Sequence, residues 1–367
     1  MTNARTQAEN VTMSTGGLYS LATVGAMHVI DNATPRVIRA LEGIKAENDS
    51  AWTFSDMGCA DGGTSLNLWR SVLQHLNGRG SDRDVQIVYA DQSRNDFNAL
   101  VQILHGHTSF ASYLPEFPNA RVLQSGASFY TPVLAKHSLH LGFSATAMHW
   151  LSSKPADITD HVHMVGANSQ DRALYAQQAA ADWETILLHR ARELTSGGKL
   201  VLVNFCIDEH GQYLGSTGGV NMFDTLNNLW QNWADDGTVT AAEYHAMTLP
   251  QYYNSVQEFS APLMDSNSAV YKAGLRLVDI ETAVVPCPFA ESFKTHRDAN
   301  KFADAYIPTI RSWNESIFHA ALSSERSAQE RQELIDAYYG SYRQLVATQP
   351  EGHGMGYAHA YMTIEKV

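Results

Sequence analysis

The residues that could do chemistry begin with a glycine-rich turn. Residues 54–64 (FSDMGCADGGT) follow an apolar, strand-like start, and Asp56 stands where that strand would end. Gly58, Gly62 and Gly63 allow the backbone to turn sharply and to approach a bound ligand closely. No Gly-Lys-Ser/Thr sequence follows, which excludes a phosphate-binding P-loop, and the spacing departs from the full dinucleotide fingerprint.

A second acid stands at the end of the next expected strand. Residues 85–90 (VQIVYA) have the pattern of a buried strand, and Asp91 follows directly, 35 residues after Asp56. This separation fits one strand–helix–strand unit. A carboxylate at such a strand end can accept hydrogen bonds from both hydroxyls of a ribose. A single Asp is more often a surface residue that begins a turn, but two acids at matching strand ends indicate a nucleoside site.

The strand, the Asp-x-Gly-x-x-x-Gly turn and the helix after it are typical of S-adenosylmethionine-dependent methyltransferases. In those enzymes the amino-acid part of the cofactor lies over the glycines. Glycine-rich turns after strands also occur in other nucleotide-binding proteins and in structural loops, so the turn alone leaves these alternatives open.

The elements that must position these residues alternate between two hydrophobic periodicities, which is typical of an α/β fold with a parallel sheet. The pattern predicts strands over residues 51–57, 85–90, 199–207 and 357–364, and helices over residues 66–76 and 172–194. Gly197 and Gly198 are expected to stop the second of these helices.

Two further helical regions are not followed at once by strands. Residues 211–264 are rich in Asn, Trp and Tyr, and residues 292–345 are also helical in pattern. We interpret both as a cap over the carboxyl edge of the sheet, where ligands bind in such folds. The predicted division is a cofactor-binding core of residues 1–210, 268–290 and 355–367 and a cap of residues 211–267 and 291–354.

Composition narrows the class of protein. The chain has 367 residues, of which 44% are hydrophobic and 17% charged, and its formal charge is −13. This balance is typical of a globular protein and argues against nucleic acid or an anionic membrane as a partner. No apolar run approaches the length of a bilayer crossing, and residues 1–17 lack the pattern of a signal peptide. Three cysteines suggest reduced thiols and a cytoplasmic location.

Sixteen histidines raise the alternative of a metal site. The candidate pairs are His161 and His163, near Asp157 and Asp160, and His105 and His107. Neither pair lies near the glycine turn in sequence, so no metal is predicted.

Several motifs of the chain, in this order, are similar to those of the SABATH methyltransferases, which methylate salicylate, benzoate, jasmonate and xanthines. Residues 89–98 (YADQSRNDFN) resemble that family's Asn-Asp-Phe-Asn segment. The other matching motifs are residues 128–130 (SFY), 138–140 (SLH), 144–155 with Trp150-Leu-Ser, and 249–252 (LPQY). The resemblance runs from about residue 17 to the C-terminus.

This resemblance implies a Rossmann-like seven-stranded sheet with a helical cap over the active site, S-adenosylmethionine as cofactor with S-adenosylhomocysteine as its product, a small-molecule acceptor and a homodimer. By position, the residues that would hold the cofactor are Tyr19, Thr23, Asp56, Gly58, Cys59, Ala60, Gly62, Asp91, Gln92, Ser128, Phe129, Ser144 and Ala145. Phe129 would stack on the adenine while Ser128 bonds near it. The residues that would contact the acceptor are Ala26, Thr146, His149, Trp150, Met222, Phe223 and Phe302, with His149 and Trp150 as the catalytic pair.

Four positions depart from the family pattern. The Gln that binds the substrate carboxylate in the family is replaced by Ala26, and the Tyr four residues before Trp150 is replaced by Thr146. Phe223 replaces a Trp that packs on flat aromatic substrates, and Thr64 stands where the plant enzymes have Asn. The cofactor half of the resemblance is therefore better supported than the acceptor half, and salicylate is disfavoured as the acceptor.

The predicted reaction is methyl transfer to the carboxylate of a small acid, which gives a methyl ester. Such a group has a reference pKa of about 4 and is ionised at neutral pH, so the protein must supply alignment and a dry pocket but no general base. The Trp150 indole N–H and His149 are the candidate donors to the carboxylate.

Three alternatives stay open at this point. A heterocyclic N–H or a hydroxyl acceptor would require His149 to take up a proton, which would make the protein an N- or O-methyltransferase. A lone His and Trp are more often a core pair. A protein that binds the cofactor but has lost its acceptor site is the non-enzymatic alternative.

Overall fold

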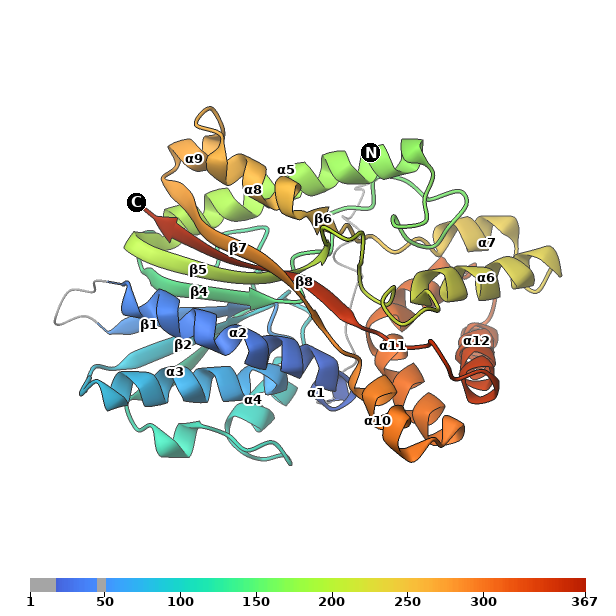
Figure 1. Cartoon of the computed structure of the whole chain (residues 1–367), viewed down its shortest axis with the longest axis horizontal. Helices are drawn as coiled ribbons and strands as arrows, with labels where there is room; N and C mark the ends of the chain where they lie inside the picture. The colour runs from blue at the N-terminus through green and yellow to red at the C-terminus, as the bar shows by residue number, and fades with distance from the viewer. Residues whose placement is uncertain (1–17, 45–50) are drawn as a thin grey trace.

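The computed structural model describes residues 18–44 and 51–367 and has the expected α/β architecture (Figure 1). A twisted sheet lies between two helical layers, and further helices gather beyond one end of its strands. Residues 1–17, which were expected to carry no signal peptide, lie outside the described residues.

Seven of the described strands follow one another in the sheet in the order β3-β2-β1-β4-β5-β8-β7, and the short β6 pairs with the end of β5 as an eighth strand. The strands are β1 (Trp52–Met57), β2 (Val85–Ala90), β3 (Ala120–Ser125), β4 (Leu139–Ala145), β5 (Leu194–Ile207), β6 (Asn254–Ser255), β7 (Leu275–Val285) and β8 (Tyr357–Lys366). The predicted seven-stranded sheet is confirmed. It departs from the expected parallel arrangement at β8, which is antiparallel to both β5 and β7.

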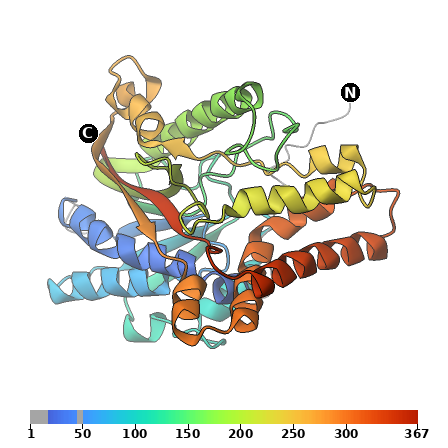
Figure 2. The same ribbon diagram turned by 45° about the vertical axis from the view of Figure 1, so that its right-hand side comes forward.

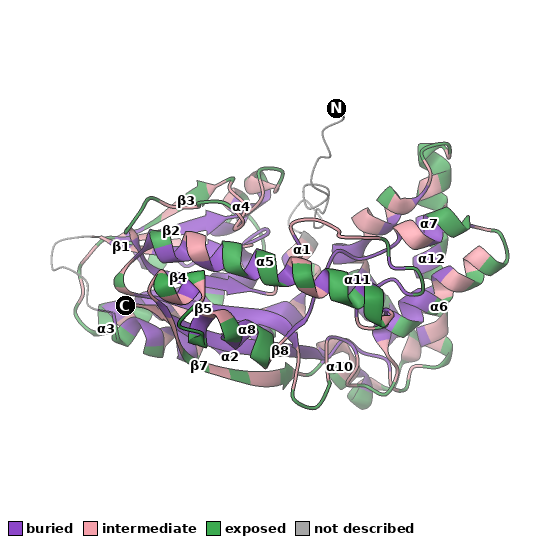
Figure 3. Ribbon diagram, turned by 90° about the horizontal axis from the view of Figure 1, so that it is seen from above, coloured by how far each residue is buried: buried purple, intermediate pink, exposed green. Residues whose placement is uncertain are grey.

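Helices cover both faces of this sheet. On one face lie α2 (Val24–Glu42), α3 (Leu66–Gly78) and α4 (Phe97–Leu104), and on the other lie α5 (Ser169–Glu193), α8 (Val256–Met264) and α9 (Ala269–Lys272). The short α1 (Leu18–Ala22) precedes α2, and single 3-10 turns occur at Gly63–Ser65 and Leu114–Glu116. Buried residues concentrate on the strands and on the inward faces of the helices (Figure 3).

The apolar periodicity of α3 explains how this helix packs. Leu66, Trp69, Leu73 and Leu76 all lie on its buried face, as expected for apolar residues three and four apart. The helix follows the glycine turn directly, so its packing on the sheet also fixes the position of the turn.

The long helix α5 corrects one sequence prediction. Asn168 caps its start, because its side chain accepts hydrogen bonds from the Gln170 and Asp171 N–H groups. The helix ends at Glu193. Leu194 is already extended and begins β5. Gly197 has a φ of +75° but lies inside β5, so the prediction that Gly197 and Gly198 stop the helix is wrong. The chain turns from helix to strand without a left-handed residue.

The helices beyond the strand ends form a second layer of packing (Figure 2). They are α6 (Met222–Asp235), α7 (Ala241–Ala246), α10 (Pro288–His296), α11 (Ala299–Ala321) and α12 (Ala328–Thr348). Trp230 of α6 stacks on Tyr338 of α12 with ring centroids 4.0 Å apart. These aromatic contacts hold the cap helices to one another.

One part of the segment expected in the cap lies elsewhere. Helix α8 packs against α5, where the Trp183 indole N–H donates to Phe259 O at 3.1 Å and the two rings are 5.2 Å apart. Residues 256–264 therefore contact the sheet side of the molecule, and the division of the chain into core and cap stays a prediction.

Among the described helices, none is both long enough and apolar enough to cross a membrane.

Candidate active site

The candidate site lies at the carboxyl ends of the central strands. β1 pairs with β2 on one side and with β4 on the other, and this reversal of strand order is where ligands bind in doubly wound sheets. Except for Tyr19 and Thr23, which lie before β1, the residues predicted to hold the cofactor end or follow β1, β2, β3 or β4, so the sheet brings them to one edge. Ser144 is already engaged there, because its Oγ donates to Met57 O at 2.7 Å.

The turn after β1 has three residues in the left-handed region. Their φ values are +75° at Gly58, +48° at Ala60 and +73° at Gly62. A Cβ atom on Gly58 would lie 2.3 Å from the Ala147 Cβ and 3.6 Å from the Phe129 ring. Glycine at this position therefore allows the loops after β1, β3 and β4 to approach one another.

Asp91 holds the strained residue of this turn. Its Oδ2 accepts from the Ala60 N–H at 2.8 Å and its Oδ1 accepts from the Gln92 N–H at 2.7 Å. Asn95 donates its amide to Ala60 O at 2.7 Å. A carboxylate offers about four acceptor positions, so each Asp91 oxygen keeps capacity for a further donor. The donor set of a ribose fits this site.

Asp56 is a buried acid with one strong donor. The Trp69 indole N–H donates to its Oδ2 at 3.0 Å. Burial raises the pKa of Asp56 to about 6, the nearby Asp91 charge adds to the increase, and hydrogen bonds from Ser65 and Trp69 oppose it. A cationic ligand group would stabilise the ionised form, so the amino-acid part of S-adenosylmethionine fits this position.

Asp61 is a functional candidate that the sequence analysis missed, although it lies inside the quoted glycine motif. The Asp61 Oδ2 accepts from the Ser20 N–H at 3.0 Å. The Asp61 Oδ1 accepts from the Ser20 hydroxyl and, at 3.3 Å, from the Gly63 N–H. Asp61 therefore ties α1 to the turn. This link places Tyr19 and Thr23 over the edge of the sheet.

A buried ion pair holds the loop that contains Ser128 and Phe129. Arg190 and Glu193 are both fully buried, and their Nε–Oε2 distance is 2.7 Å. Arg190 donates to Phe129 O at 3.1 Å and to Thr131 O at 2.9 Å. Glu193 accepts from two backbone N–H groups of the same loop. The last turn of α5 thus fixes the ring expected to stack on adenine.

A partly open cavity adjoins this edge, with about 430 Å³ of space when its open mouth is included. Six residues that the sequence analysis assigned to the site line it, namely Tyr19, Thr23, Ala26, Thr146, His149 and Trp150. Seven further lining residues were not predicted, namely Phe205, Leu214, Gln251, Tyr253, Trp313, Met355 and Tyr357. Gln251 belongs to the quoted motif at 249–252, whereas no sequence signal pointed to Trp313.

Three predicted acceptor residues lie outside this lining. Phe223 is fully buried and stacks on His163 at a centroid distance of 4.0 Å, 6.0 Å from the Tyr253 ring. Phe302 is buried among other aromatic rings of the cap, and Met222 packs against the backbone at residue 215. The structure places all three in the core around the cavity, so direct contact with an acceptor stays a prediction for them.

His149 is buried among aromatic rings, 4.8 Å from Phe205 and 5.4 Å from Trp150 between ring centroids. Burial lowers the pKa of His149 well below its usual value, and repulsion from His359 lowers it further. Its Nδ1 has no hydrogen-bond partner among the described residues. His149 is therefore a neutral ring at physiological pH and a weak proton acceptor.

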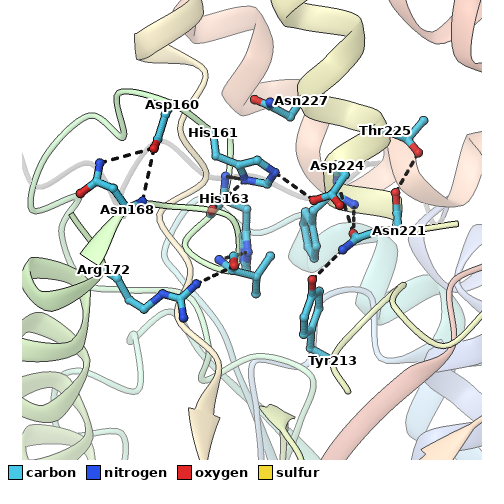
Figure 4. A network of polar contacts seen from close by, with 12 residues as sticks. Asp160, His161, His163, Asn168, Arg172, Tyr213, Asn221, Asp224, Thr225 and Asn227 are labelled. Atoms are coloured by element: carbon cyan, nitrogen blue, oxygen red, sulfur yellow. Dashed lines mark hydrogen bonds and ion pairs between the residues drawn. The ribbon is translucent and has the colours of Figure 1, made fainter. Parts of the chain in front are cut away.

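The histidine pair His161 and His163 links two segments of the chain (Figure 4). His161 Nε2 lies 3.3 Å from Asp224 Oδ1, and its Nδ1 accepts from the His163 N–H at 3.0 Å. Asn221 caps α6 by accepting from the Phe223 N–H at 2.9 Å. These contacts join the segment after β4 to the cap. In residues 18–44 and 51–367 no three His, Cys, Asp or Glu side chains form a group suited to a metal ion.

A solved structure shares the fold of this chain. The chain matches a structure described as loganic acid methyltransferase with SAH, with a TM-score of 0.74 over 97% of this chain and 98% of that one, at 19% sequence identity. The fold is therefore that of an S-adenosylmethionine-dependent methyltransferase.

Sequence comparison then gives the family. A family model described as SAM dependent carboxyl methyltransferase matches residues 20–365, so the chain belongs to this family, the SABATH methyltransferases. Farnesoic acid carboxyl-O-methyltransferase of Arabidopsis thaliana is 26% identical over 60% of this chain, and indole-3-acetate O-methyltransferase 1 of the same plant is 28% identical over 62%. The matched regions span only 64% and 65% of those two relatives.

The raised pKa of Asp56 predicts a pH-dependent affinity for S-adenosylhomocysteine, whose amino group is cationic. As the pH falls through about 6, Asp56 takes up a proton and affinity should fall. Asp56→Asn keeps an acceptor for Trp69 but carries no charge. This variant should therefore bind S-adenosylhomocysteine more weakly than the wild type at about pH 8, and its affinity should not fall further as the pH decreases. Calorimetric titration across this range tests the prediction, and equal pH dependence in both proteins contradicts it.

The contact from Arg190 to the Phe129 loop predicts coupling between these two residues. Phe129→Ala should weaken S-adenosylhomocysteine binding about 10- to 100-fold through lost stacking, and Arg190→Lys should weaken it several-fold because the loop is less constrained. The double variant should lose less binding free energy than the sum of the two single losses, since the two residues act on one contact. Strictly additive losses in a calorimetric double-mutant cycle would refute this role for Arg190.

Proposed function

We propose that the protein is an S-adenosylmethionine-dependent methyltransferase that methylates the carboxylate of a small-molecule acid and releases its methyl ester. The observation that carries this choice of acceptor is the neutral, deeply buried His149. With its pKa far below the usual value, this ring is a poor base for an acceptor N–H or O–H. A carboxylate needs no base, because it is already ionised at neutral pH.

Different residues would bind different parts of the cofactor. Asp91 would accept from the ribose hydroxyls, Ser128 and Phe129 would hold the adenine, and Asp56 with the glycine turn would hold the amino-acid part. When bound, S-adenosylmethionine supplies a methyl group that a carboxylate oxygen accepts without loss of a proton, leaving S-adenosylhomocysteine. The remaining assignments of cofactor residues stay predictions.

The acceptor-side residues would supply orientation and exclude water. The Trp150 indole N–H and the neutral His149 can donate to the carboxylate, and the aromatic walls of the cavity keep bulk water away. Correct placement of two reactants can lower a barrier by up to about 7–11 kcal/mol, so no further catalytic group is required. The names of the relatives, which include three acids as substrates, support this acceptor class.

Asp91→Ala should weaken S-adenosylhomocysteine binding by about tenfold or more, because two hydrogen bonds to a charged group are lost. His149→Ala should retain wild-type affinity for that ligand and lose turnover, because this ring lies on the acceptor side. Calorimetry and a radiolabelled methyl-transfer assay on both variants separate the roles. Wild-type affinity in Asp91→Ala would contradict the assignment.

The nature of the product tests the acceptor class. A panel of small acids with radiolabelled S-adenosylmethionine should yield a labelled product that mild alkali hydrolyses to methanol, as expected for a methyl ester. A labelled product that resists alkali would indicate methylation of a nitrogen or of a hydroxyl group and reject the proposal.

A homodimer and a cytoplasmic location were also predicted from the sequence, and both stay predictions. Light scattering of the purified chain tests the first.

A further inference from the structure

The polar groups around the cavity differ in whether they remain available to a ligand. The Tyr19 hydroxyl interacts with Thr146, and the Thr23 hydroxyl donates to Tyr19 O at 2.8 Å. The Tyr253 hydroxyl donates to Gln251 Oε1 at 3.1 Å. None of these O–H groups is therefore free to hold an acceptor.

Besides His149, three described lining residues have a side-chain N–H group without a hydrogen-bond partner, namely Trp150, Gln251 and Trp313. The Trp150 indole N–H and the Gln251 amide N–H₂ have no hydrogen-bond partner among the described residues. Neither nitrogen is among the unpaired polar atoms that are completely buried. Both residues line the cavity. Their free donors therefore reach it.

Backbone pairing puts these two donors side by side. Trp150 and Gln251 form an antiparallel bridge. The hydrogen bonds around it run from the Leu151 N–H to Pro250 O and from the Tyr252 N–H to His149 O, both at 2.9 Å. Residues directly opposite in such a bridge project their side chains to the same side, with Cβ atoms about 4.5–5.5 Å apart.

The neighbours of Gln251 fix which end of its amide faces the cavity. His163 Nδ1 accepts from the Val165 N–H at 3.3 Å, so the neutral ring carries its proton on Nε2. Gln251 interacts with this ring, and the Tyr253 hydroxyl also contacts Gln251 Oε1. His163 Nε2 makes no hydrogen bond among the described residues, so the Tyr253 hydroxyl is the group that holds the amide oxygen and leaves the N–H₂ group for the cavity.

We propose that Gln251 and Trp150 together bind the acceptor carboxylate, one N–H from each, and that the acceptor is a monocarboxylic acid with an uncharged, apolar body. This inference rests on the proposed function. In the family a Gln at the position of Ala26 binds the substrate carboxylate. In this chain the carboxamide of Gln251 would supply that donor instead.

The rest of the lining defines the acceptor body. The lining residues that the structure describes include no Lys, Arg, Asp or Glu, so a second carboxylate on the acceptor would be buried there without a counter-charge, which is costly. Phe205, Trp313 and Tyr357 offer flat apolar surface instead. Dicarboxylic acids should therefore be excluded.

Gln251→Met tests the donor, because Met has a similar size and no N–H. We expect the KM for the best acid of a panel of benzoate, phenylacetate and octanoate to rise about 10- to 100-fold, as for a lost hydrogen bond to a charged group. Calorimetry should give the same rise in the Kd of that acid for the protein saturated with S-adenosylhomocysteine, whose own affinity stays within about twofold. The matched control is Gln344→Met on the exposed face of α12, which should leave all of these values unchanged.

Two further variants test orientation and charge. Gln251→Glu should weaken acid binding more than Gln251→Met, since a second carboxylate would face the first. Tyr253→Phe removes the hydroxyl that orients the amide, so it should raise KM several-fold with little change in kcat, whereas a purely structural role would lower Tm without a change in KM.

The outcomes separate this inference from the proposed function. Wild-type acid affinity in Gln251→Met, equal losses in the Met and Glu variants, or efficient methylation of adipate would each overturn the role or acceptor class assigned here, even if methyl esters form. If the wild-type protein binds S-adenosylhomocysteine and methylates no acid, the proposed function itself fails.

Discussion

The hydrogen bond from the Ala60 N–H to Asp91 is the contact on which the cofactor edge depends. Ala60 has a backbone conformation that a residue with a Cβ atom rarely adopts, so the turn keeps this shape because the end of β2 holds it. In the proposed function the same Asp91 also accepts hydrogen bonds from the ribose of the cofactor. One carboxylate would then hold the turn and bind the ligand, which would link the stability of this edge to its function.

The acceptor side follows a different physical rule. Its walls are aromatic and its histidines are neutral, because burial penalises their charged forms. A charged acceptor group can enter such a cavity only where N–H donors meet it. The antiparallel pairing of residues 149–151 with residues 250–252 brings donors from two distant parts of the chain next to each other in the lining.

The sequence predicted the cofactor edge better than the cavity, for physical reasons. Asp56, Gly58 and Asp91 lie at strand ends, and strand ends can be located from hydrophobic periodicity and turn residues alone. Gln251 and Tyr253 enter the site through a pairing between segments about a hundred residues apart, which no local pattern specifies. Phe223 was expected in the lining because its position in the cap was recognised, but the side of α6 that faces the cavity depends on how the cap packs. Helix α5 ends without its predicted glycine stop because the pairing of β5 begins at Leu194.

The tether between Asp61 and Ser20 also has a consequence for how two ligands influence each other. Asp61 belongs to the cofactor turn, while Tyr19, the neighbour of Ser20, forms part of the wall of the acceptor cavity. A nucleoside that stabilises the turn would therefore also stabilise that wall. By thermodynamic linkage, any gain in acid affinity that results must be matched by an equal gain in nucleoside affinity when the acid is present.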